Sequence, residues 1–166
     1  MIIISDTSII INLARVEHLH LLPQLFQEVV IPKAVFQEVV IEGNGQPGAT
    51  EIAEADWIEV IACQNQSFIQ TLLDEIDLGE AEAIGLALEQ TDEALLLLDE
   101  RRGRSVADRF LLTHIGILGI LLEAKSEGYI ATVQPIMDRL IQEARFYISD
   151  SLYQQVLVLA GEEKSI

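Results

Sequence analysis

Short, unbroken apolar runs alternate with helical stretches along the first two thirds of the chain, and this alternation restricts the possible folds more than any other feature. The runs cover residues 2–4, 29–31, 57–61 and 94–98. Runs without polar interruption are typical of parallel strands that are buried on both faces. Strands alternating with helices therefore predict an α/β fold of three α/β/α layers with a mainly parallel central sheet.

Helical patterns fill the intervals between these strands and most of the remaining chain. They cover residues 18–26, 32–41, 79–89 and 101–112, and a further helical segment spans about 117–160. The Gly-rich loop 42–48 lies inside the alternating pattern, so it predicts a surface loop rather than a linker. The sequence thus predicts a single domain, residues 1–166, that includes the C-terminal helices. The last helix has two apolar faces, and we expect it to dock on the body or on a partner subunit.

Composition excludes several classes of protein. The chain has 10 Lys and Arg residues against 27 Asp and Glu, a formal charge of −17 that repels nucleic acid at long range. A coating role on DNA or RNA is excluded, whereas an enzyme that contacts a few phosphates through metal ions is not. The single Cys63 excludes a disulfide framework and a multi-cysteine zinc site, which suits a reducing cytoplasm. No apolar run is long enough to cross a membrane, and the N-terminus lacks the features of a signal peptide.

Two acids directly follow predicted strands. Asp6 comes after the first strand and Asp99 after the run at 94–98. In open α/β sheets, ligands bind outside the carboxyl ends of the strands, so both acids are placed for chemistry. The alternative for each is a helix N-cap, and position alone does not decide between the two.

Two glutamates on predicted helices complete the set. On a helical wheel Glu80 lies within the apolar arc, whereas Glu82 and Glu89 fall on the opposite side and are expected to face solvent. A carboxylate directed at the core is costly unless it is paired or binds a metal. Glu38 borders the apolar face of the helix that Pro32 opens, and a rim glutamate is an equally good interpretation of that pattern.

Several carboxylates gathered within about 4 Å of one another would each repel a neighbour by about 4 kcal/mol at an effective dielectric constant near 20. A cation must offset that repulsion. Oxygen-rich sites without Cys or His suit Mg²⁺ or Mn²⁺. The corresponding reaction is hydrolysis of a phosphodiester by metal-activated water.

Four motifs in order resemble those of PIN-domain proteins, and in particular small prokaryotic proteins like the VapC toxins. They are DTSIIINL at residues 6–13, IPKAVFQEV at 31–39, LGEAEAI at 78–84 and LLDERRGR at 97–104. The resemblance implies an Mg²⁺- or Mn²⁺-dependent endoribonuclease with an RNA substrate. It also implies a toxin with a cognate antitoxin protein, in many cases a homodimer. A PIN-fold interaction module that binds a metal or a protein without cleaving RNA is the alternative.

Carried over by position, the resemblance assigns roles to the matching residues. Asp6, Glu38, Glu80 and Asp99 form the catalytic, metal-binding quartet, although Glu100 is an alternative to Asp99. Ser8 and Asn12 are supporting polar residues near Asp6. The arginines after Asp99, namely Arg101, Arg102 and Arg104, are candidates for contact with RNA or antitoxin, or else they neutralise the acidic cluster.

Overall fold

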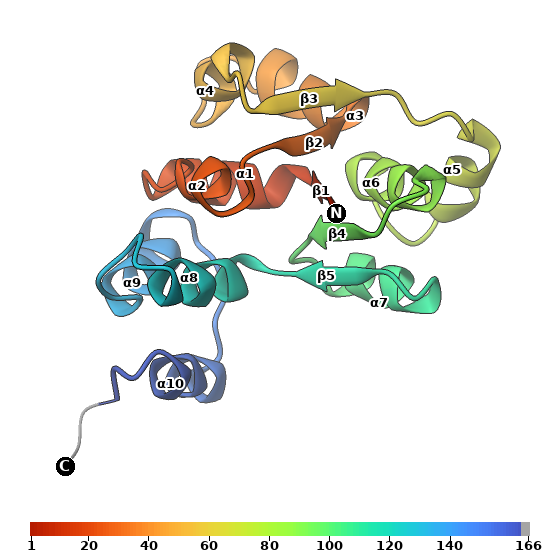
Figure 1. Cartoon of the computed structure of the whole chain (residues 1–166). Coiled ribbons are helices and arrows are strands. Elements are labelled where there is room, and N and C mark those ends of the chain that lie inside the picture. The colour runs from red at the N-terminus through yellow and green to blue at the C-terminus, as the bar shows by residue number, and fades with distance from the viewer. Residues whose placement is uncertain (164–166) are drawn as a thin grey trace.

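A five-stranded parallel sheet forms the centre of the molecule in the computed structural model, which describes residues 1–163 (Figure 1). The strand order is β3-β2-β1-β4-β5, and every neighbouring pair is parallel. The strands are β1 (Ile2–Ser5), β2 (Val29–Pro32), β3 (Ile58–Ile61), β4 (Ala94–Leu97) and β5 (Thr113–Ile115). The predicted α/β/α architecture with a parallel sheet is confirmed.

The four apolar runs all became strands, and the fifth strand was not predicted. β5 follows a shorter helix than expected, because the helix predicted over 101–112 ends at Arg109. Its three residues, Thr113 to Ile115, are half-exposed at the edge of the sheet and carry mixed polarity, so they produce no strand pattern.

Helices connect successive strands and cover both faces of the sheet. They are α1 (Thr7–Arg15), α2 (Leu21–Phe26), α3 (Lys33–Phe36), the π-helix η1 (Gln37–Glu42), α4 (Ala49–Glu54), α5 (Gln66–Leu72), α6 (Leu78–Glu89), α7 (Arg101–Arg109), α8 (Ile117–Ser126), α9 (Gln134–Glu143) and α10 (Asp150–Leu159). α4 and α5 were not predicted. None of the helices within residues 1–163 has the length and apolar character needed to span a membrane.

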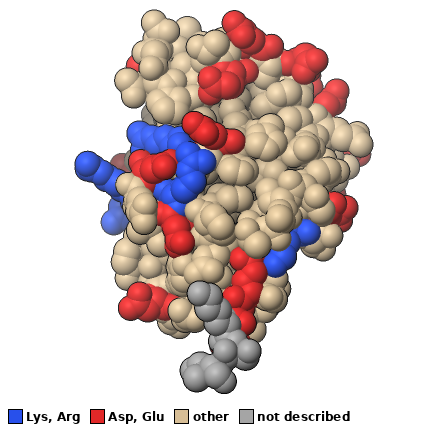
Figure 2. All heavy atoms as spheres, turned by 90° about the vertical axis from the view of Figure 1, so that its left-hand side faces the viewer, with Lys and Arg blue, Asp and Glu red and all other residues tan. Residues whose placement is uncertain are grey.

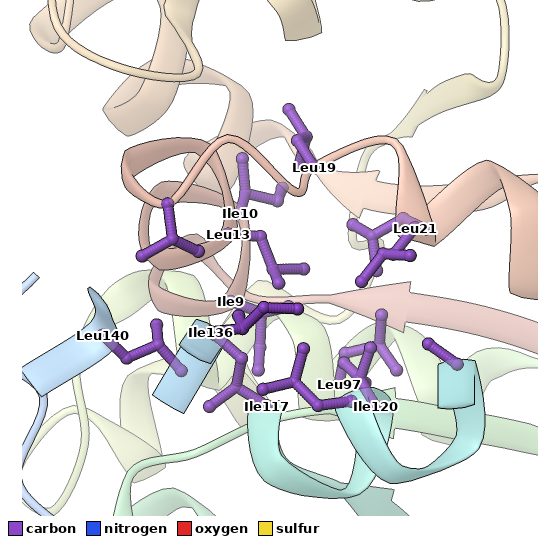
Figure 3. Packing of buried hydrophobic residues seen from close by; sticks show 14 of the residues in the cluster. Ile9, Ile10, Leu13, Leu19, Leu21, Leu97, Ile117, Ile120, Ile136 and Leu140 are labelled. Carbon is purple, nitrogen blue, oxygen red and sulfur yellow. The ribbon is translucent and has the colours of Figure 1, made fainter. Parts of the chain in front are cut away.

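The core has two parts, one on each face of the sheet. Alternate residues of β1 point to opposite faces, so Ile3 belongs to one part and Ile4 to the other. On the Ile3 face lie α1, α2, α8 and α9, whose packed Ile and Leu side chains are shown in Figure 3. On the Ile4 face lie α5, α6 and α7. These two layers position the starts of α1, α6, α7 and α8 around one edge of the sheet.

The last helix, α10, docks on the body through Val156 and Leu157, which are buried. It lies against α8 at the outer side of the molecule (Figure 1). Three apolar residues of its other side, Leu152, Val158 and Leu159, remain exposed. One of its two apolar faces is therefore covered by the chain itself.

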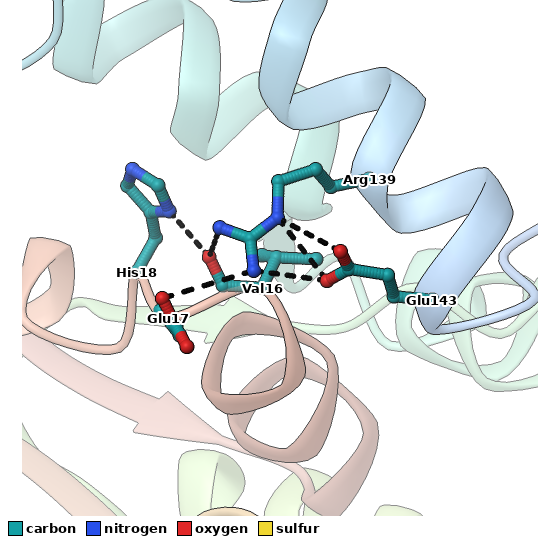
Figure 4. A network of polar contacts seen from close by, with 5 residues as sticks. All are labelled: Val16, Glu17, His18, Arg139 and Glu143. Carbon is teal, nitrogen blue, oxygen red and sulfur yellow. Dashed lines mark hydrogen bonds and ion pairs between the residues drawn. The ribbon is translucent and has the colours of Figure 1, made fainter.

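One arginine joins α9 to the end of α1 (Figure 4). Arg139 Nη1 donates to the carbonyl oxygen of Val16 at 2.9 Å, while its Nη2 is 2.9 Å from Oε2 of Glu143 and 3.8 Å from Oε2 of Glu17. The Nδ1 atom of His18 lies 2.6 Å from the same carbonyl oxygen. The contact connects positions far apart in the sequence and fixes α9, and the loop that follows it, against α1.

Candidate metal centre at the carboxyl edge of the sheet

Asp6 and Asp99 follow neighbouring strands at the carboxyl edge of the sheet. β1 and β4 are paired with Ser5 opposite Leu97, and the N–H of Asp6 donates to the carbonyl oxygen of Leu97 at 3.2 Å. The chain leaves β1 toward β2 on one side and reaches β4 on the other, so the crevice between these strands is the topological switch point of the sheet. Ligands of doubly wound sheets bind at this point.

Asp6 caps a helix with one oxygen and leaves the other free. Its Oδ1 accepts from the N–H of Ile9 at 3.1 Å, which is the N-cap bond of α1. Its Oδ2 is buried and has no hydrogen-bond partner within the described chain. Capping and function were alternatives for this residue, and the structure shows that capping uses only half of the carboxylate.

Glu80 repeats this arrangement at the start of α6. Asp77 and Glu80 form a capping box, in which the N–H of Glu80 donates to Asp77 Oδ1 at 2.8 Å and the N–H of Asp77 donates to Glu80 Oε1 at 3.4 Å. The second oxygen, Glu80 Oε2, is buried without a partner among residues 1–163. Gly103 of α7 lies so close to this oxygen that a Cβ atom there would clash with it.

The expectation that Glu82 faces solvent is wrong, whereas Glu89 is partly exposed. Glu82 is buried, and its Oε1 accepts from the N–H of Ala34 at 3.1 Å, which joins α6 to α3. Glu89 is half-buried and accepts from the N–H groups of Gln64 and Asn65, both at 2.8 Å. Most of α6 is enclosed on all sides, so the position of a glutamate on the helical wheel does not separate inside from outside.

Asp99 does not cap the helix that follows it. Its two oxygens lie 3.1 and 3.2 Å from the N–H of Ile117, the first residue of α8, and Oδ1 also accepts from Arg104 Nη2 at 3.1 Å. The N-cap position of α7 is held by Glu100, whose side chain makes no capping bond. Glu100 is exposed, whereas the side chain of Asp99 is largely buried. Asp99 therefore holds the start of α8 against the end of β4.

Glu38 lies on the π-helix η1, a turn type that is common at functional sites. Its Oε2 accepts from the hydroxyl of Thr7 at 2.7 Å, and Gly79 at the start of α6 leaves room for its carboxylate. Thr7 directly follows Asp6 and was not among the predicted site residues. The DTS motif contains two hydroxyl side chains, those of Thr7 and Ser8, but the helical pattern could not show which of them faces the acids.

The carboxylates at this edge hold protons more tightly than usual. Burial raises the pKa of Asp6 well above its usual value, and the charges of Asp99, Glu80 and Asp77 raise it further. Burial, followed by the charge of Asp77, raises the pKa of Glu80 to about 7. Burial likewise raises the pKa of Asp99 and of Glu38, although hydrogen bonds from Ile117 and Thr7 oppose the change.

Three helix N-termini partly offset this concentration of negative charge. α1 begins at Asp6, α6 at the Asp77 and Glu80 box, and α8 at the Ile117 amide that Asp99 accepts. Each helix start carries a partial positive charge of about half an electron. These partial charges stabilise the carboxylates but do not equal their full charges, so a cation is still favoured between them.

A model of the PIN-domain family matches residues 2–162. The chain belongs to the PIN-domain family. Neither the curated proteins nor the solved structures include a match. PIN domains are in general nucleases and typically use divalent metal ions.

The acidic edge of this PIN domain suits such an ion in its chemistry. Asp6 Oδ2 and Glu80 Oε2 are buried anionic oxygens without protein partners, and a hard cation supplies the interaction that they lack. Within residues 1–163, no three His, Cys, Asp or Glu side chains form a group already arranged to hold a metal. Asp6 thus lies close enough to Asp99 and Glu80 for their charges to raise its pKa, but these acids do not form a closed set of ligands.

A pocket of about 550 Å³ opens beside Asp99 in the PIN domain. Its lining contains several residues that the sequence suggested and a segment that it did not. The lining residues are Ser8, Asn12, Asp99, Glu100, Arg101, Ala144, Arg145, Phe146 and Tyr147. Ser8 therefore faces this pocket, and it forms no hydrogen bond with Asp6 within the described residues. The segment 144–147 was missed because it comes from the loop after α9, far from the motifs.

The arginines after Asp99 point in different directions. Arg101 lines the pocket beside Asp99, and Arg102 lines a second pocket next to Asp74. Arg104 donates to Asp99 and to the carbonyl oxygen of Leu98, so it neutralises the acidic cluster. Tyr147, which borders the pocket beside Asp99, is 85% exposed.

Proposed function

We propose that this PIN domain is an Mg²⁺- or Mn²⁺-dependent endoribonuclease that hydrolyses RNA phosphodiester bonds. The observation that carries the proposal is the pair of buried, unpartnered oxygens on Asp6 and Glu80 at the switch point of the sheet. A buried carboxylate oxygen without a hydrogen-bond partner destabilises the folded protein, and a purely structural role does not offset this cost. Cation binding gives both oxygens a partner.

Asp6, Glu80, Glu38 and Asp99 are the residues that would hold the ion, and the surrounding side chains fix their orientation. When bound, the ion supplies a nucleophilic water at neutral pH and stabilises charge on the phosphate. Thr7 holds one oxygen of Glu38, and Arg104 with the Ile117 amide holds Asp99. These contacts limit the rotation of the acids, so a substrate phosphate would meet ligands in a defined arrangement.

The charge distribution supports a substrate that contacts the protein at few phosphates. Figure 2 shows a face on which the Lys and Arg side chains gather in two places, each in contact with acidic side chains. A basic surface for a long nucleic-acid backbone is not present on that face. Recognition would therefore depend on the metal and on the residues next to Asp99.

The test is cleavage of varied RNAs by purified protein with Mg²⁺ or Mn²⁺, compared with the Asp6→Asn variant. Asn caps a helix as well as Asp does, so the variant should keep α1 and the fold. It removes a charged ligand, and we expect cleavage to fall by at least roughly a hundredfold, since even indirect disturbance of metal ligands costs about 10–100-fold.

Asp56→Asn is the matched control, because it removes the same charge from an exposed position between α4 and β3. We expect it to cleave like the wild type. Equal cleavage by Asp6→Asn and the wild type would contradict the proposed function.

A non-catalytic interaction module is the second candidate, and the ion pair between Arg104 and Asp99 favours it. With the guanidinium and the Ile117 amide on its oxygens, Asp99 is already satisfied without a metal. Calorimetric binding of Mn²⁺ with no cleavage of any RNA would support this candidate. Release of Arg104 from Asp99 on Mn²⁺ binding, together with cleavage, would exclude it.

For the physiological role we propose a VapC-like toxin that acts as a homodimer and is held inactive by an antitoxin protein. The exposed Leu152, Val158 and Leu159 on α10 supply apolar surface for contact between subunits. Expression without a partner should arrest growth, and co-expression of a small protein from the adjacent reading frame should relieve the arrest. Light scattering of the purified chain would show a dimer mass, and a monomer at micromolar concentration would contradict the dimer.

A further inference from the structure

The pocket beside Asp99 combines elements from opposite ends of the chain. Ser8 and Asn12 on α1 form one wall, Glu100 and Arg101 at the start of α7 another, and the loop from Ala144 to Tyr147 closes it. Asp99 also lines the pocket and is one of the acids of the candidate metal centre. A group bound in this pocket would lie directly beside a phosphate at the metal.

Two unpaired cations face this pocket. The chain has ten Lys and Arg residues, and Lys164 lies outside the described residues. Among the others, Arg104, Arg109, Lys125 and Arg139 form ion pairs. Arg101 and Arg145 are exposed, line the pocket, and form no ion pair within residues 1–163. In a protein with a net charge of −17, two free arginines at one pocket are a strong local exception.

An exposed aromatic ring stands at the same pocket. The side chain of Tyr147 is 85% exposed and borders both this pocket and the apolar groove next to α10. The neighbouring residues of its loop, Phe146 and Ile148, instead pack against the core. Tyr147 is thus the exposed ring of this stretch, whereas the half-buried Phe146 lines the pocket while it packs against the core. A nucleobase is a flat partner for such a ring.

The backbone at Arg145 is in an unfavourable conformation. Its φ angle is 53°, in the left-handed region that a bulky side chain rarely adopts. This position follows α9, whose C-cap is Ala144, and glycine is the residue usually found there. Glu17, Gln27 and Leu111 adopt the same conformation at other helix ends, so the angle marks the end of α9, and the role of the arginine is argued from its place at the pocket.

We infer that this pocket binds one unpaired nucleotide of the RNA substrate next to the bond that is cut. Tyr147 stacks on the base, Arg101 and Arg145 bind the flanking phosphates, and Ser8 and Asn12 hydrogen-bond to the base or sugar. The inference rests on the proposed ribonuclease function, and what it adds is the place of this nucleotide, between α1, the start of α7 and the loop after α9. Duplex RNA does not fit, because its bases are stacked on one another and its backbone needs more cations than the pocket offers.

Fluorescence anisotropy of labelled RNA tests this inference on the Asp6→Asn background with Mg²⁺ present, so that binding is measured without cleavage. The probes are a random-sequence pool of single strands of roughly eight nucleotides, within the usual site size of single-strand binders, and a hairpin duplex. We expect the single strands to bind at least about tenfold more tightly than the duplex. Tyr147→Ala should weaken binding of the single strands about tenfold, and Tyr147→Phe should leave it unchanged.

Arg145→Gly separates a binding role from a structural one. Glycine relieves the strained φ angle, so the melting temperature should stay the same or rise. Binding of the single strands should nevertheless fall roughly three- to tenfold because a phosphate contact is lost. The controls are Arg15→Ala, which removes an unpaired charge at the far end of α1, and Tyr129→Ala, which removes a ring that borders a different pocket.

The possible results of these binding and cleavage experiments separate the inference from the proposed function. If Tyr147→Ala and Arg145→Gly bind RNA like their controls, or if the duplex binds as tightly as the single strands, the inference is wrong. Binding that depends on Tyr147 without cleavage of any RNA by the wild type would contradict only the proposed function. Cleavage that Asp6→Asn abolishes and Tyr147→Ala leaves unchanged would contradict only the inference.

Discussion

At the scale of single residues, the candidate site contains carboxylates that use one oxygen for structure and leave the other free for the proposed metal ion. Asp6 and Glu80 each satisfy a backbone N–H with one oxygen and bury the other without a partner. The structural oxygen fixes the rotamer, and this fixes the position of the free oxygen. Helix capping and metal binding, which the sequence pattern treats as alternatives, are therefore compatible in a single carboxylate.

Glu80 makes the metal-free protein sensitive to pH. Burial raises its pKa to about 7 in the folded state from a usual 4.5, so folding favours the protonated form. Its stabilising contribution is complete below about pH 4.5 and is lost as the pH rises through about 7. We expect the metal-free Glu80→Gln variant to have a melting temperature on the order of 5 °C above that of the wild type at pH 8, and close to it at pH 5. The shift at pH 8 corresponds to a difference of roughly 2 kcal/mol in the free energy of unfolding.

Glu59→Gln is the control, because Glu59 is exposed on β3 and carries the same charge. Thermal unfolding in chelator at the two pH values would measure both variants. Added Mg²⁺ should raise the melting temperature of the wild type at pH 8 and have little effect on Glu80→Gln. Equal melting of Glu80→Gln and the wild type at pH 8 would show that the buried charge is already compensated within the chain.

The sequence pattern directed attention to Asp6 and Glu80, which have the unpartnered buried oxygens, but it did not predict the burial of Glu82. The helical wheel assumes one solvent-facing side, and α6 has almost none, because α3, α5, α7 and the sheet surround it. The prediction that Glu80 faces the core and Glu82 the solvent therefore depended on an incorrect assumption about the surroundings of α6. What distinguishes the two is the partner: Glu82 has the Ala34 amide, whereas one oxygen of Glu80 has none.

At the scale of secondary-structure elements, the site depends on close approach between helix ends. α7 passes the start of α6 at Gly103, where the absence of a side chain gives Glu80 its space. η1 brings Glu38 to Thr7, and its wide turns differ from the regular helix predicted over 32–41. Element types and order could be read from the sequence, but such distances between elements could not.

Gly103→Ala should reverse the usual effect of replacing a helical glycine. Alanine normally stabilises a helix by about 0.5–1 kcal/mol relative to glycine. Here the added Cβ would clash with Glu80 Oε2 and lie 3.1 Å from Leu98 Cδ1. We expect destabilisation by about 1–3 kcal/mol, as for other overpacked sites, together with weaker Mn²⁺ binding.

Ser105→Ala, at an exposed position of the same helix, is the control for helix propensity and should be neutral or slightly stabilising. Urea unfolding would give the stability of both variants, and calorimetry with Mn²⁺ would give their affinity. A Gly103→Ala protein more stable than the wild type, with unchanged Mn²⁺ affinity, would show that Glu80 can move aside without consequence.

At the scale of the whole molecule, an acidic protein is proposed to act on an acidic polymer. The sequence predicted that local cations would resolve this conflict and located them after Asp99. In the structure these cations have different places. Arg104 pairs with Asp99 within the acidic site, whereas Arg101 lines the pocket together with Arg145, which follows α9. Nothing in the local pattern around 144–147 could indicate this, because the pocket exists only after α9 has packed against α1.

RNA binding should therefore depend only weakly on salt. Two phosphate contacts, by Arg101 and Arg145, predict a slope of about −1.4 for the logarithm of the affinity against the logarithm of the salt concentration. Between about 50 and 200 mM KCl the affinity of single-stranded RNA should fall less than about tenfold. Anisotropy titrations on the Asp6→Asn variant at constant Mg²⁺ would measure this slope, and a value near −5 would require a larger basic surface than these two arginines form.

The contact between Arg139 and Val16 affects the order in which the acids and the wall of the pocket take their places during synthesis. All four acids precede residue 100, so the part of the chain that carries them leaves the ribosome before α9 does. The wall that carries Arg145 and Tyr147 can take its place only when Arg139 has reached the end of α1. On the proposed function, a nascent chain would thus expose its acids before it can bind RNA in the pocket, and its own messenger would be spared until α9 has folded.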